Sequence, residues 1–470
     1  KLLQNFPYYS SSISAKNKTC FFIYDMIISK TKQKGQYDYE KILLSSVALL
    51  SLVSTLAVSS PVSAQESSSQ TTYSTSSGSW IKSGSRWWYK HSDGSYTTNG
   101  WEKIGGTWYY FDSEGWMKTG WIKEYGNWYY LDDSGAMKTG WCWVSGSWYY
   151  LNTSGVMQTG WCRVSGIWYY LNTSGVMQTG LQTIGGNEYY LNTSGAMQTG
   201  WQNIGDDTYF FASSGARQTI NRRALVLGET STRAVPIEDV NAMEKVFSNQ
   251  NFSEVVRFPD KTKAEIIAKM EDLFKSSSES DVNYLYLTCH GGENGKIAIG
   301  SDKTSFSGWE LASILKQYKG KFVVMVDCCY SGKIIDVGKP DKKLASKSEE
   351  RFDEQAFLAG FSTGDLASKN GEMLDSKFLV LCASWKGEKS YSLVGIGSLA
   401  NRYWAMGTGW DSLQNRMISP MADTNTNGKI TLEELYQYSY PLVLEAASSS
   451  NKEQHVSVYP ENSQFVLFQK

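Results

Sequence analysis

The sequence predicts two folded parts: a solenoid of β-hairpins, then an α/β domain whose mainly parallel sheet is flanked by helices. The first observation behind this prediction is a repeat of twenty residues, rich in Trp and Tyr, that fills positions 80–220. The second is an alternation of apolar strands and amphipathic helices after residue 220. The third is the length of 470 residues, which is more than one hydrophobic core ordinarily fills.

Composition and charge exclude several functions. The 45 basic and 46 acidic residues give a formal net charge of −1, which argues against a nucleic-acid partner because phosphate binding needs a basic excess. The seven cysteines form no CxxC pair, so neither a zinc site nor a disulfide framework is indicated, and no motif indicates a redox cofactor. His91, His290 and His455 are the only histidines available for Cys/His chemistry.

Residues 1–64 are predicted to be a leader with a signal peptide. KILLSSVALLSLVSTLAVSSPVSAQE has a basic flank, an apolar stretch and the small residues Val62 and Ala64 before a cleavage site. The alternative is a transmembrane helix, but serines interrupt the stretch and no charged stop-transfer cluster follows, so we expect export. Translation could start at Met26, since the sequence opens on Lys. Residues 65–79, rich in Ser and Thr, are expected to form a flexible linker.

The repeat of residues 80–220 is typified by WIKEYGNWYYLDDSGAMKTG and WCRVSGIWYYLNTSGVMQTG. Each unit holds two short aromatic strands, a turn with glycine and a closing Thr-Gly, which makes a hairpin too small to be stable alone. Stacking successive hairpins would bury their apolar faces, which predicts a solenoid. Two later copies are degenerate, one at Leu181 and Glu188 and the last at Thr208 and Arg217.

Aromatic side chains of each hairpin are expected to lie on two faces. Alternate residues of a strand share a face, so Trp128 and Tyr130 should point to one side and Tyr129 to the other. A cleft walled by Trp and Tyr, with residues such as Met137 beside it, would attract a quaternary ammonium through the ring quadrupoles. The alternative is that the aromatic residues only pack together, but a tryptophan-rich array on an exported chain favours binding.

The pattern GW…WYY…G-x-M-x-TG resembles the choline-binding repeats of Gram-positive surface proteins. The resemblance implies docking on the phosphocholine of teichoic acids or of a related cell-wall polymer. Similar repeats bind α-glucans in other secreted proteins, so a glucan is the alternative ligand. Cys142 and Cys162 hold the same place in successive repeats, where packing of a small residue is favoured over pairing. The residues implied in binding are Trp101, Trp108, Trp121, Trp128, Tyr130, Trp141, Trp148, Tyr150, Trp161, Trp168 and Tyr170.

Residues 221–470 are predicted to form one α/β domain. Its strands are RRALVLGE, SEVVRF, YLYLTCHGG, FVVMVDCC and KFLVLCAS, and its helices include IEDVNAMEKVF, KAEIIAKMEDLF and SGWELASILKQY. One helix joins YLYLTCHGG to FVVMVDCC, so the right-handed crossover rule makes these strands neighbours. Their carboxyl ends then lie at the edge where open α/β sheets place their sites.

A histidine and a cysteine pair end these two strands. His290 follows the first, and Cys328 and Cys329 follow the second, so an imidazole and a thiol are expected within reach of one substrate. The imidazole would take the thiol proton, and Gly291 suits a backbone amide aimed at a developing oxyanion. Taken alone, the cysteine could be a buried structural residue and the histidine a hydrogen-bonded structural residue. Their joint position favours a catalytic dyad.

The order H-G…D-x-C-x-S-G resembles the caspases and metacaspases, whose catalytic His and Cys close successive strands. The resemblance implies that Cys329 is the nucleophile, with Asp327 in support and Cys328 packed beneath. Metacaspases carry acidic residues in the substrate pocket for a basic side chain, but here Lys386 and Gly387 fall near those positions, which leaves the specificity open. The residues implied in the pocket are Ser384, Lys386 and Glu388.

The stretch DTNTNGKITLEE has the spacing of an EF-hand loop, with Gly428 at the sharp turn. Only two of the ligands are charged, so calcium affinity is expected to be weak. The alternative is an Asn/Gly turn that caps the following helix. The candidate ligands are Asp423, Asn425, Asn427, the carbonyl of Lys429, Thr431 and Glu434.

Together these patterns predict a secreted, wall-attached cysteine endopeptidase that acts on a peptide or protein through a His290/Cys329 dyad. The alternatives are a wall-bound pseudoprotease whose dyad is unused and a glucan-bound enzyme. The polar segment 333–376 predicts self-cleavage between the two halves of the peptidase, with a plain surface insertion as the alternative.

Overall fold

The computed structural model describes residues 77–231, 235–334 and 376–469. The predicted leader and signal peptide, and most of the predicted linker, lie outside these residues. In the described part of the chain, no helix is both long and apolar enough to cross a membrane.

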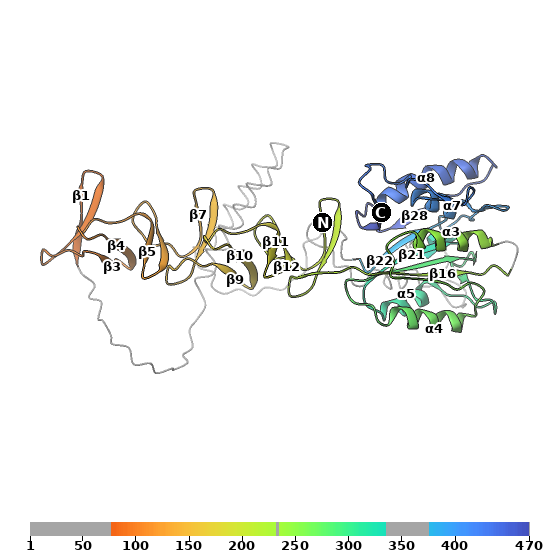
Figure 1. The fold of residues 1–470 in the computed structure, drawn as a ribbon, viewed down its shortest axis with the longest axis horizontal. Helices are drawn as coiled ribbons and strands as arrows, with labels where there is room; N and C mark the ends of the chain where they lie inside the picture. Colours follow the sequence, from red (N-terminus) through yellow and green to blue (C-terminus); the bar gives the residue numbers. More distant parts are fainter. Residues whose placement is uncertain (1–76, 232–234, 335–375, 470) are drawn as a thin grey trace, which may run out of the picture. The chain divides into compact units, whose positions relative to one another are not determined.

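Residues 78–218 form antiparallel hairpins that follow one another along the chain (Figure 1). Strand pairing confirms the predicted repeat, because equivalent residues pair in equivalent registers, as in Trp121 with Tyr130 and Trp161 with Tyr170. The hairpins are β1 (Gly78–Ser83) with β2 (Arg86–His91), β3 (Gly100–Ile104) with β4 (Thr107–Phe111), β5 (Gly120–Glu124) with β6 (Asn127–Leu131), β7 (Gly140–Val144) with β8 (Ser147–Leu151), β9 (Gly160–Val164) with β10 (Ile167–Leu171), β11 (Gly180–Ile184) with β12 (Asn187–Leu191), and β13 (Gly200–Ile204) with β14 (Asp207–Phe211), to which β15 (Arg217–Gln218) adds a strand.

Neighbouring hairpins are joined by a backbone bond and by a row of buried side chains. The amide of Met137 donates to the carbonyl of Trp108 in the preceding hairpin at 2.9 Å, and the same bond recurs along the solenoid. Gly135, at φ 82°, packs on Met117, so that a Cβ there would lie 2.3 Å from the sulfur. From the second hairpin onward, the last residue of each second strand, such as Leu171, is buried. Each hairpin therefore completes the core of its neighbour.

The second part is built on a six-stranded sheet in the order β17-β16-β18-β21-β22-β28. All neighbours are parallel except β22 and β28, which are antiparallel, so the predicted mainly parallel sheet is confirmed. The strands are β16 (Arg222–Gly228), β17 (Glu254–Arg257), β18 (Val282–Thr288), β21 (Lys321–Asp327), β22 (Phe378–Cys382) and β28 (Ser457–Tyr459).

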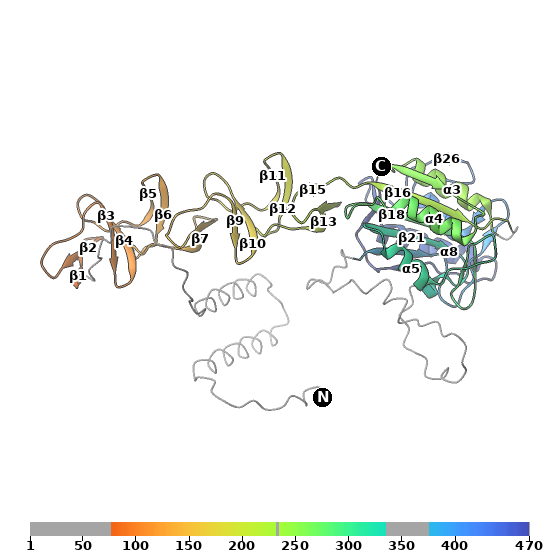
Figure 2. The same ribbon diagram turned by 90° about the horizontal axis from the view of Figure 1, so that it is seen from below.

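Helices cover both faces of this sheet (Figures 1 and 2). On one face lie α4 (Lys263–Phe274) and α5 (Gly308–Lys316), and on the other lie α3 (Ile237–Ser248), α7 (Leu399–Gly407) and α8 (Leu432–Ser448). Thr262 and Glu265 form a capping box that fixes the start of α4. Smaller pairs are β23 (Ser392–Leu393) with β24 (Gly397–Ser398), β25 (Trp410–Asp411) with β26 (Arg416–Met417), and β27 (Lys429–Thr431) with β29 (Val466–Gln469).

The pairing of β18 with β21 fixes where the candidate catalytic residues lie. Thr288 pairs with Asp327 at the last position of both strands, so His290 and Cys329 each come two residues past the same edge. The predicted adjacency of these strands is confirmed.

Truncating a buried leucine of the solenoid should show that the row of side chains holds it together. Leu171→Ala should lower the free energy of unfolding by about 2–5 kcal/mol, since its side chain is fully buried and a cavity would remain. Leu181→Ala, at a position that is 37% exposed, should cost less than about 1.5 kcal/mol. Urea unfolding followed by tryptophan fluorescence measures both, and equal losses would contradict the packing described.

Candidate functional site

The turn that carries His290 lies directly against Cys329. His290 and Gly291 form β19 (His290–Gly291), which pairs with β20 (Ile297–Ala298) just beyond β18. A Cβ on Gly291 would lie 1.7 Å from the carbonyl oxygen of Cys329, so only glycine allows this approach. His290 and Cys329 line the same pocket. The structure therefore brings together the two residues that the sequence paired.

The adjacent cysteines differ in their surroundings. Cys328 is 3% exposed and belongs to the core cluster that also contains Cys289 and Cys382. Cys329 is partly exposed, and its Sγ donates to the carbonyl of Ser390 at 3.7 Å. The next residue, Tyr330, has a φ of 59°, which turns the chain sharply after the strand. Both cysteines belong to the lining of the pocket, but Cys328 is packed in the core whereas Cys329 is partly exposed, and the role of Cys329 as the nucleophile stays a prediction.

Burial raises the pKa of the Cys329 thiol above its ordinary value, an effect that outweighs the hydrogen bond to Ser390. The proton therefore stays on the sulfur at neutral pH. A nucleophilic reaction at this thiol needs a base to remove that proton, and His290 is the imidazole beside it.

Two buried carboxyl groups stand in the wall of the same pocket. Asp239 lies in the first turn of α3, and Asp327 is the last residue of β21. Burial raises the pKa of Asp327 to about 6. Burial, and then the charge of Asp327, raise the pKa of Asp239 well above its usual range. Burial and mutual repulsion thus both disfavour the charged form of these two carboxyl groups.

Hydroxyl groups keep both carboxyl groups in place. Asp327 accepts from Ser390 Oγ at 3.1 Å and from Ser398 Oγ. Asp239 accepts from the amide of Ser398 at 2.8 Å and from Thr288 Oγ1 at 3.2 Å. Ser390 thus contacts Asp327 through its hydroxyl and the thiol of Cys329 through its carbonyl. Asp327 is held in the pocket wall by this network, and its supporting role in the reaction stays a prediction.

Asp239 and the two serines were not predicted from the sequence. A signal existed for Asp239, because it occupies the apolar face of α3 with Val240, Met243 and Phe247, where an acid is unusual. Ser390 and Ser398 carry no such signal, since only the folded chain brings their loop to β21.

The loop after β22 places its predicted pocket residues differently. Ser384 is fully buried, and its hydroxyl bonds the amide of Ser331 and the carbonyl of Cys328. Lys386 is exposed, and Glu388 turns away to His455. From this loop it is Ser390, Tyr391 and Ser392 that line the pocket.

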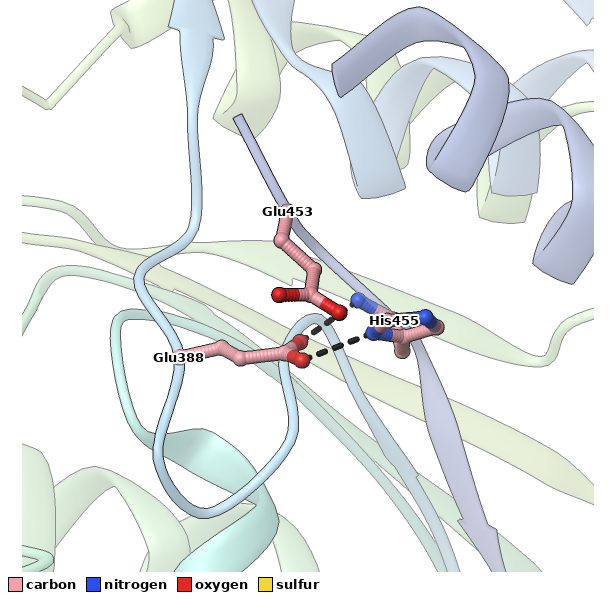
Figure 3. A group of neighbouring side chains, drawn as sticks. All are labelled: Glu388, Glu453 and His455. Carbon is pink, nitrogen blue, oxygen red and sulfur yellow. Dashed lines mark hydrogen bonds and ion pairs between the residues drawn. The ribbon is translucent and has the colours of Figure 1, made fainter. Parts of the chain in front are cut away.

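Figure 3 shows how the loop is tied to the segment before β28. Glu388 accepts from the backbone amide of His455 and pairs with its Nδ1, both at 2.7 Å, while the carboxylate of Glu453 lies close by. The ring of Trp385 stacks on His455 with 4.2 Å between centroids. The carbonyl of Glu388 also accepts from the amide of Tyr330. These contacts hold the loop against the turn that follows Cys329.

A second site lies on the open face of the hairpins. The rings of Trp121 and Trp128 are nearly perpendicular, with 6.4 Å between centroids. Tyr130 lies 5.1 Å from Trp121, and Tyr149 of the next hairpin lies 4.8 Å from it. Cross-strand pairing puts Trp121, Trp128 and Tyr130 on one face and Tyr129 on the other, which matches the predicted faces.

The arrangement recurs along the solenoid and then ends. It is repeated around Trp141 and Trp161. At the next hairpin Leu181 takes the place of the first tryptophan, and Glu188 takes the place of the second and forms an ion pair with Arg217. The members of the repeated sites are Trp101, Trp108, Tyr110, Trp121, Trp128, Tyr130, Trp141, Trp148, Tyr150, Trp161, Trp168 and Tyr170. Cys142 and Cys162 are both free thiols.

The loop 423–434 caps the start of α8, which was the alternative to calcium binding. Thr431 and Glu434 form a capping box at the start of α8. Asp423 accepts from the amides of Asn427 and Gly428, and Asn425 donates to Glu434 Oε1 at 2.9 Å. Asp423, Asn427 and Glu434 carry oxygen donors of the type that calcium takes, and in the structure these oxygens accept hydrogen bonds within the loop. Calcium at this loop stays a prediction.

The segment expected to be cut lies almost wholly in 335–375, outside the described residues. Its ends are held by η1 (Ser331–Ile334) and by Ser376, whose carbonyl accepts from Lys321.

Comparison with protein families separates the two parts. Residues 98–139, 138–179 and 178–222 match the family model described as choline-binding repeat, and residues 221–403 match the one described as caspase domain. No protein with a curated description matches the chain.

Several solved structures resemble part of the chain. Choline binding protein F from Streptococcus pneumoniae is 40% identical over 30% of this chain and 51% of its own, with a TM-score of 0.29. A pneumococcal cell wall endolysin from phage Cp-1, solved in complex with choline, is 41% identical over 28% of this chain and 40% of its own, with a TM-score of 0.22. The match thus spans about half or less of each relative.

Substituting Gly291 should disable the site without unfolding the domain. In Gly291→Ala the new methyl group would force the His290 turn away from Cys329, and a displacement of that size lowers turnover by about 100-fold. The matched control is Gly387→Ala, whose methyl group would meet nothing within 4 Å. Peptide turnover and circular dichroism measure both variants, and near-normal turnover in Gly291→Ala would contradict the geometry.

The pH dependence of Cys329 alkylation should reveal the raised thiol pKa. A raised pKa keeps the neutral thiol dominant to higher pH, so the rate of reaction with iodoacetamide should rise with a midpoint above that of free cysteine. Subtracting the rate of Cys329→Ala removes the contribution of other thiols. A midpoint below that of free cysteine would instead indicate a preformed thiolate and imidazolium pair.

Proposed function

Because the chain joins choline-binding repeats to a caspase domain, we propose that it is a secreted cysteine endopeptidase anchored at the cell wall through choline. The observation that carries the proposal is the close approach of Gly291 to Cys329 at the ends of neighbouring strands. It places an imidazole, a thiol and backbone amides around one pocket.

The proposed reaction is hydrolysis of a peptide bond through an acyl-enzyme. His290 takes the proton of the Cys329 thiol, and the sulfur attacks the carbonyl carbon of the substrate. The backbone amides of Gly291 and Cys329 would donate hydrogen bonds to the oxyanion that forms. The imidazolium returns its proton to the leaving amine, and water then hydrolyses the thioester with His290 as base. Sulfur and imidazole are restored at the end.

We propose that the residue before the cleaved bond is Lys or Arg. The acid pair of Asp239 and Asp327 lies in the pocket wall beside Cys329, where burial raises the pKa of both carboxyl groups. A cationic side chain bound there would favour the ionised form of both carboxyl groups. Lys386, near the expected pocket position, left the substrate specificity open in the sequence. We propose that the acids on α3 and β21 determine it instead.

We propose that the aromatic sites hold the choline of wall polymers such as teichoic acids. Two perpendicular tryptophans with two tyrosines present π faces on several sides, which suits a quaternary ammonium. In favour of this ligand, the Cp-1 endolysin that shares the repeat was solved in complex with choline. A glucan, which would stack on one ring face, remains the alternative, as does a pseudoprotease for the second domain.

Asp327→Asn should lower turnover of substrates with Lys or Arg before the cleaved bond by about 30-fold, which corresponds to about 2 kcal/mol of lost charge pairing. For the normal protein, kcat/KM should rise with pH through the Asp327 pKa of about 6, since ionisation creates the binding charge. A fluorogenic peptide library measures both effects.

Two controls accompany that library. Cys329→Ala should lose all turnover, whereas Cys328→Ala, whose thiol lies in the core, should keep most of it. Preference for an acidic residue before the cleaved bond would overturn the assigned specificity. Absence of any turnover in the normal protein would favour the pseudoprotease.

Trp121→Ala and Trp128→Ala should each weaken choline binding by about 1 kcal/mol, or about fivefold, through lost cation–π attraction. Leu181→Ala should change nothing, because that hairpin lacks the aromatic pair. The choline concentration that elutes the protein from an amine resin measures the effect. Retention that is insensitive to all three changes would favour a glucan.

A further inference from the structure

Where a hairpin keeps its first tryptophan, that ring contacts a ring of its own hairpin and a ring of the element that follows. Trp161 lies 5.2 Å from Tyr170 on the neighbouring strand and 4.8 Å from Tyr189 of the following hairpin, at interplanar angles of 63° and 65°. Trp141 makes the same pair of contacts. A complete site therefore needs a ring from the element that follows the hairpin.

The last hairpin has no hairpin after it, yet the same pair of contacts is present. Trp201 lies 5.1 Å from Phe210 on the neighbouring strand, at 63°. Its centroid also lies 5.1 Å from that of Phe465, at an interplanar angle of 66°. Phe465 belongs to the α/β domain, where it directly precedes β29. Phe465 thus takes the position that Tyr189 holds at Trp161.

A cation of the chain itself lies against these two rings. The Nζ of Lys321 is 5.5 Å from the centroid of Trp201 and 5.5 Å from that of Phe465. Lys321 is the first residue of β21 and is only 3% exposed. An ammonium in an aromatic site is the arrangement that choline would create elsewhere in the solenoid.

The remaining wall of the last site is also used by the α/β domain. The second tryptophan of the repeat is replaced by Thr208, whose Oγ1 accepts from the amide of Val466 at 3.2 Å. Asp207 beside it forms an ion pair with Lys429 at 2.7 Å. Trp201 is 7% exposed, whereas the equivalent tryptophans Trp141 and Trp161 are partly exposed.

We propose that the last repeat is a docking element for the α/β domain, in which Lys321 and Phe465 replace the choline and the next hairpin. The repeat is therefore not a choline site, although it belongs to the matched series. The identity of the displaced ligand rests on the proposed function, whereas the docking does not.

The test compares two substitutions at equivalent positions of the full-length protein, Trp161→Leu and Trp201→Leu. One readout is the choline concentration that elutes each protein from an amine resin. The other is the temperature at which Cys328 and Cys382, buried in the α/β core, become reactive to a thiol reagent, with the labelled cysteines located by mass spectrometry. The second readout needs no peptidase activity.

The proposal predicts opposite outcomes for the pair. Trp161→Leu should elute at several-fold lower choline with cysteine exposure unchanged. Trp201→Leu should elute like the normal protein but expose Cys328 and Cys382 at a temperature several degrees lower. Lys321→Met, which keeps the apolar stem, should act like Trp201→Leu.

Two results would overturn the proposal. One is equal loss of choline retention in Trp161→Leu and Trp201→Leu, which would make the last repeat an ordinary ligand site. The other is unchanged cysteine exposure in both Trp201→Leu and Lys321→Met. If the normal protein were not retained by the resin at all, choline anchoring would fail while the cysteine readout still decided the docking.

Discussion

The arrangement of the candidate site depends on the close approach of the Gly291 turn to the backbone of Cys329. Parallel pairing of β18 with β21 in register brings both chain ends to one edge, and the missing side chain of Gly291 lets them touch. The turn and the loop that form the rest of the site lie next to this contact. The sharp turn at Tyr330 buries Ser331 against Ser384, and the loop that carries Ser390 is held over the thiol.

The proposed recognition of cations would unite the two parts of the chain. The solenoid offers π faces, which attract an ammonium without taking up a charge of their own, whereas the peptidase pocket offers a buried pair of carboxyl groups. The first chemistry suits a permanently methylated cation that cannot donate hydrogen bonds, and the second suits a Lys or Arg side chain that can. At the last hairpin, the cation that lies against the aromatic rings is the ammonium of Lys321 from the same chain.

Much of this could be predicted from the sequence because it depends on local periodicity. The twenty-residue repeat predicted the hairpins. The alternation of strands and helices, together with the crossover rule, predicted that His290 lies near Cys329. Asp239, Ser390 and Ser398 could not be placed, because α3 and the loop after β22 reach the pocket only through contacts across the sheet. For the same reason Ser384 and Glu388 were expected in the pocket, although one is buried under Ser331 and the other pairs with His455. The sequence showed that the last repeat is degenerate. The residues that its side chains contact, Phe465 and Val466, lie some 250 residues further along the chain and could not be identified from the repeat.

The most direct test of the account is to map the covalent adduct that a peptidyl halomethyl ketone ending in Lys forms with the full-length protein. The account predicts one adduct, on Cys329, formed faster than with a matched ketone ending in Asp, because the acid pair beside that thiol attracts the cation. An adduct on Cys328, or equal rates with the two ketones, would contradict it.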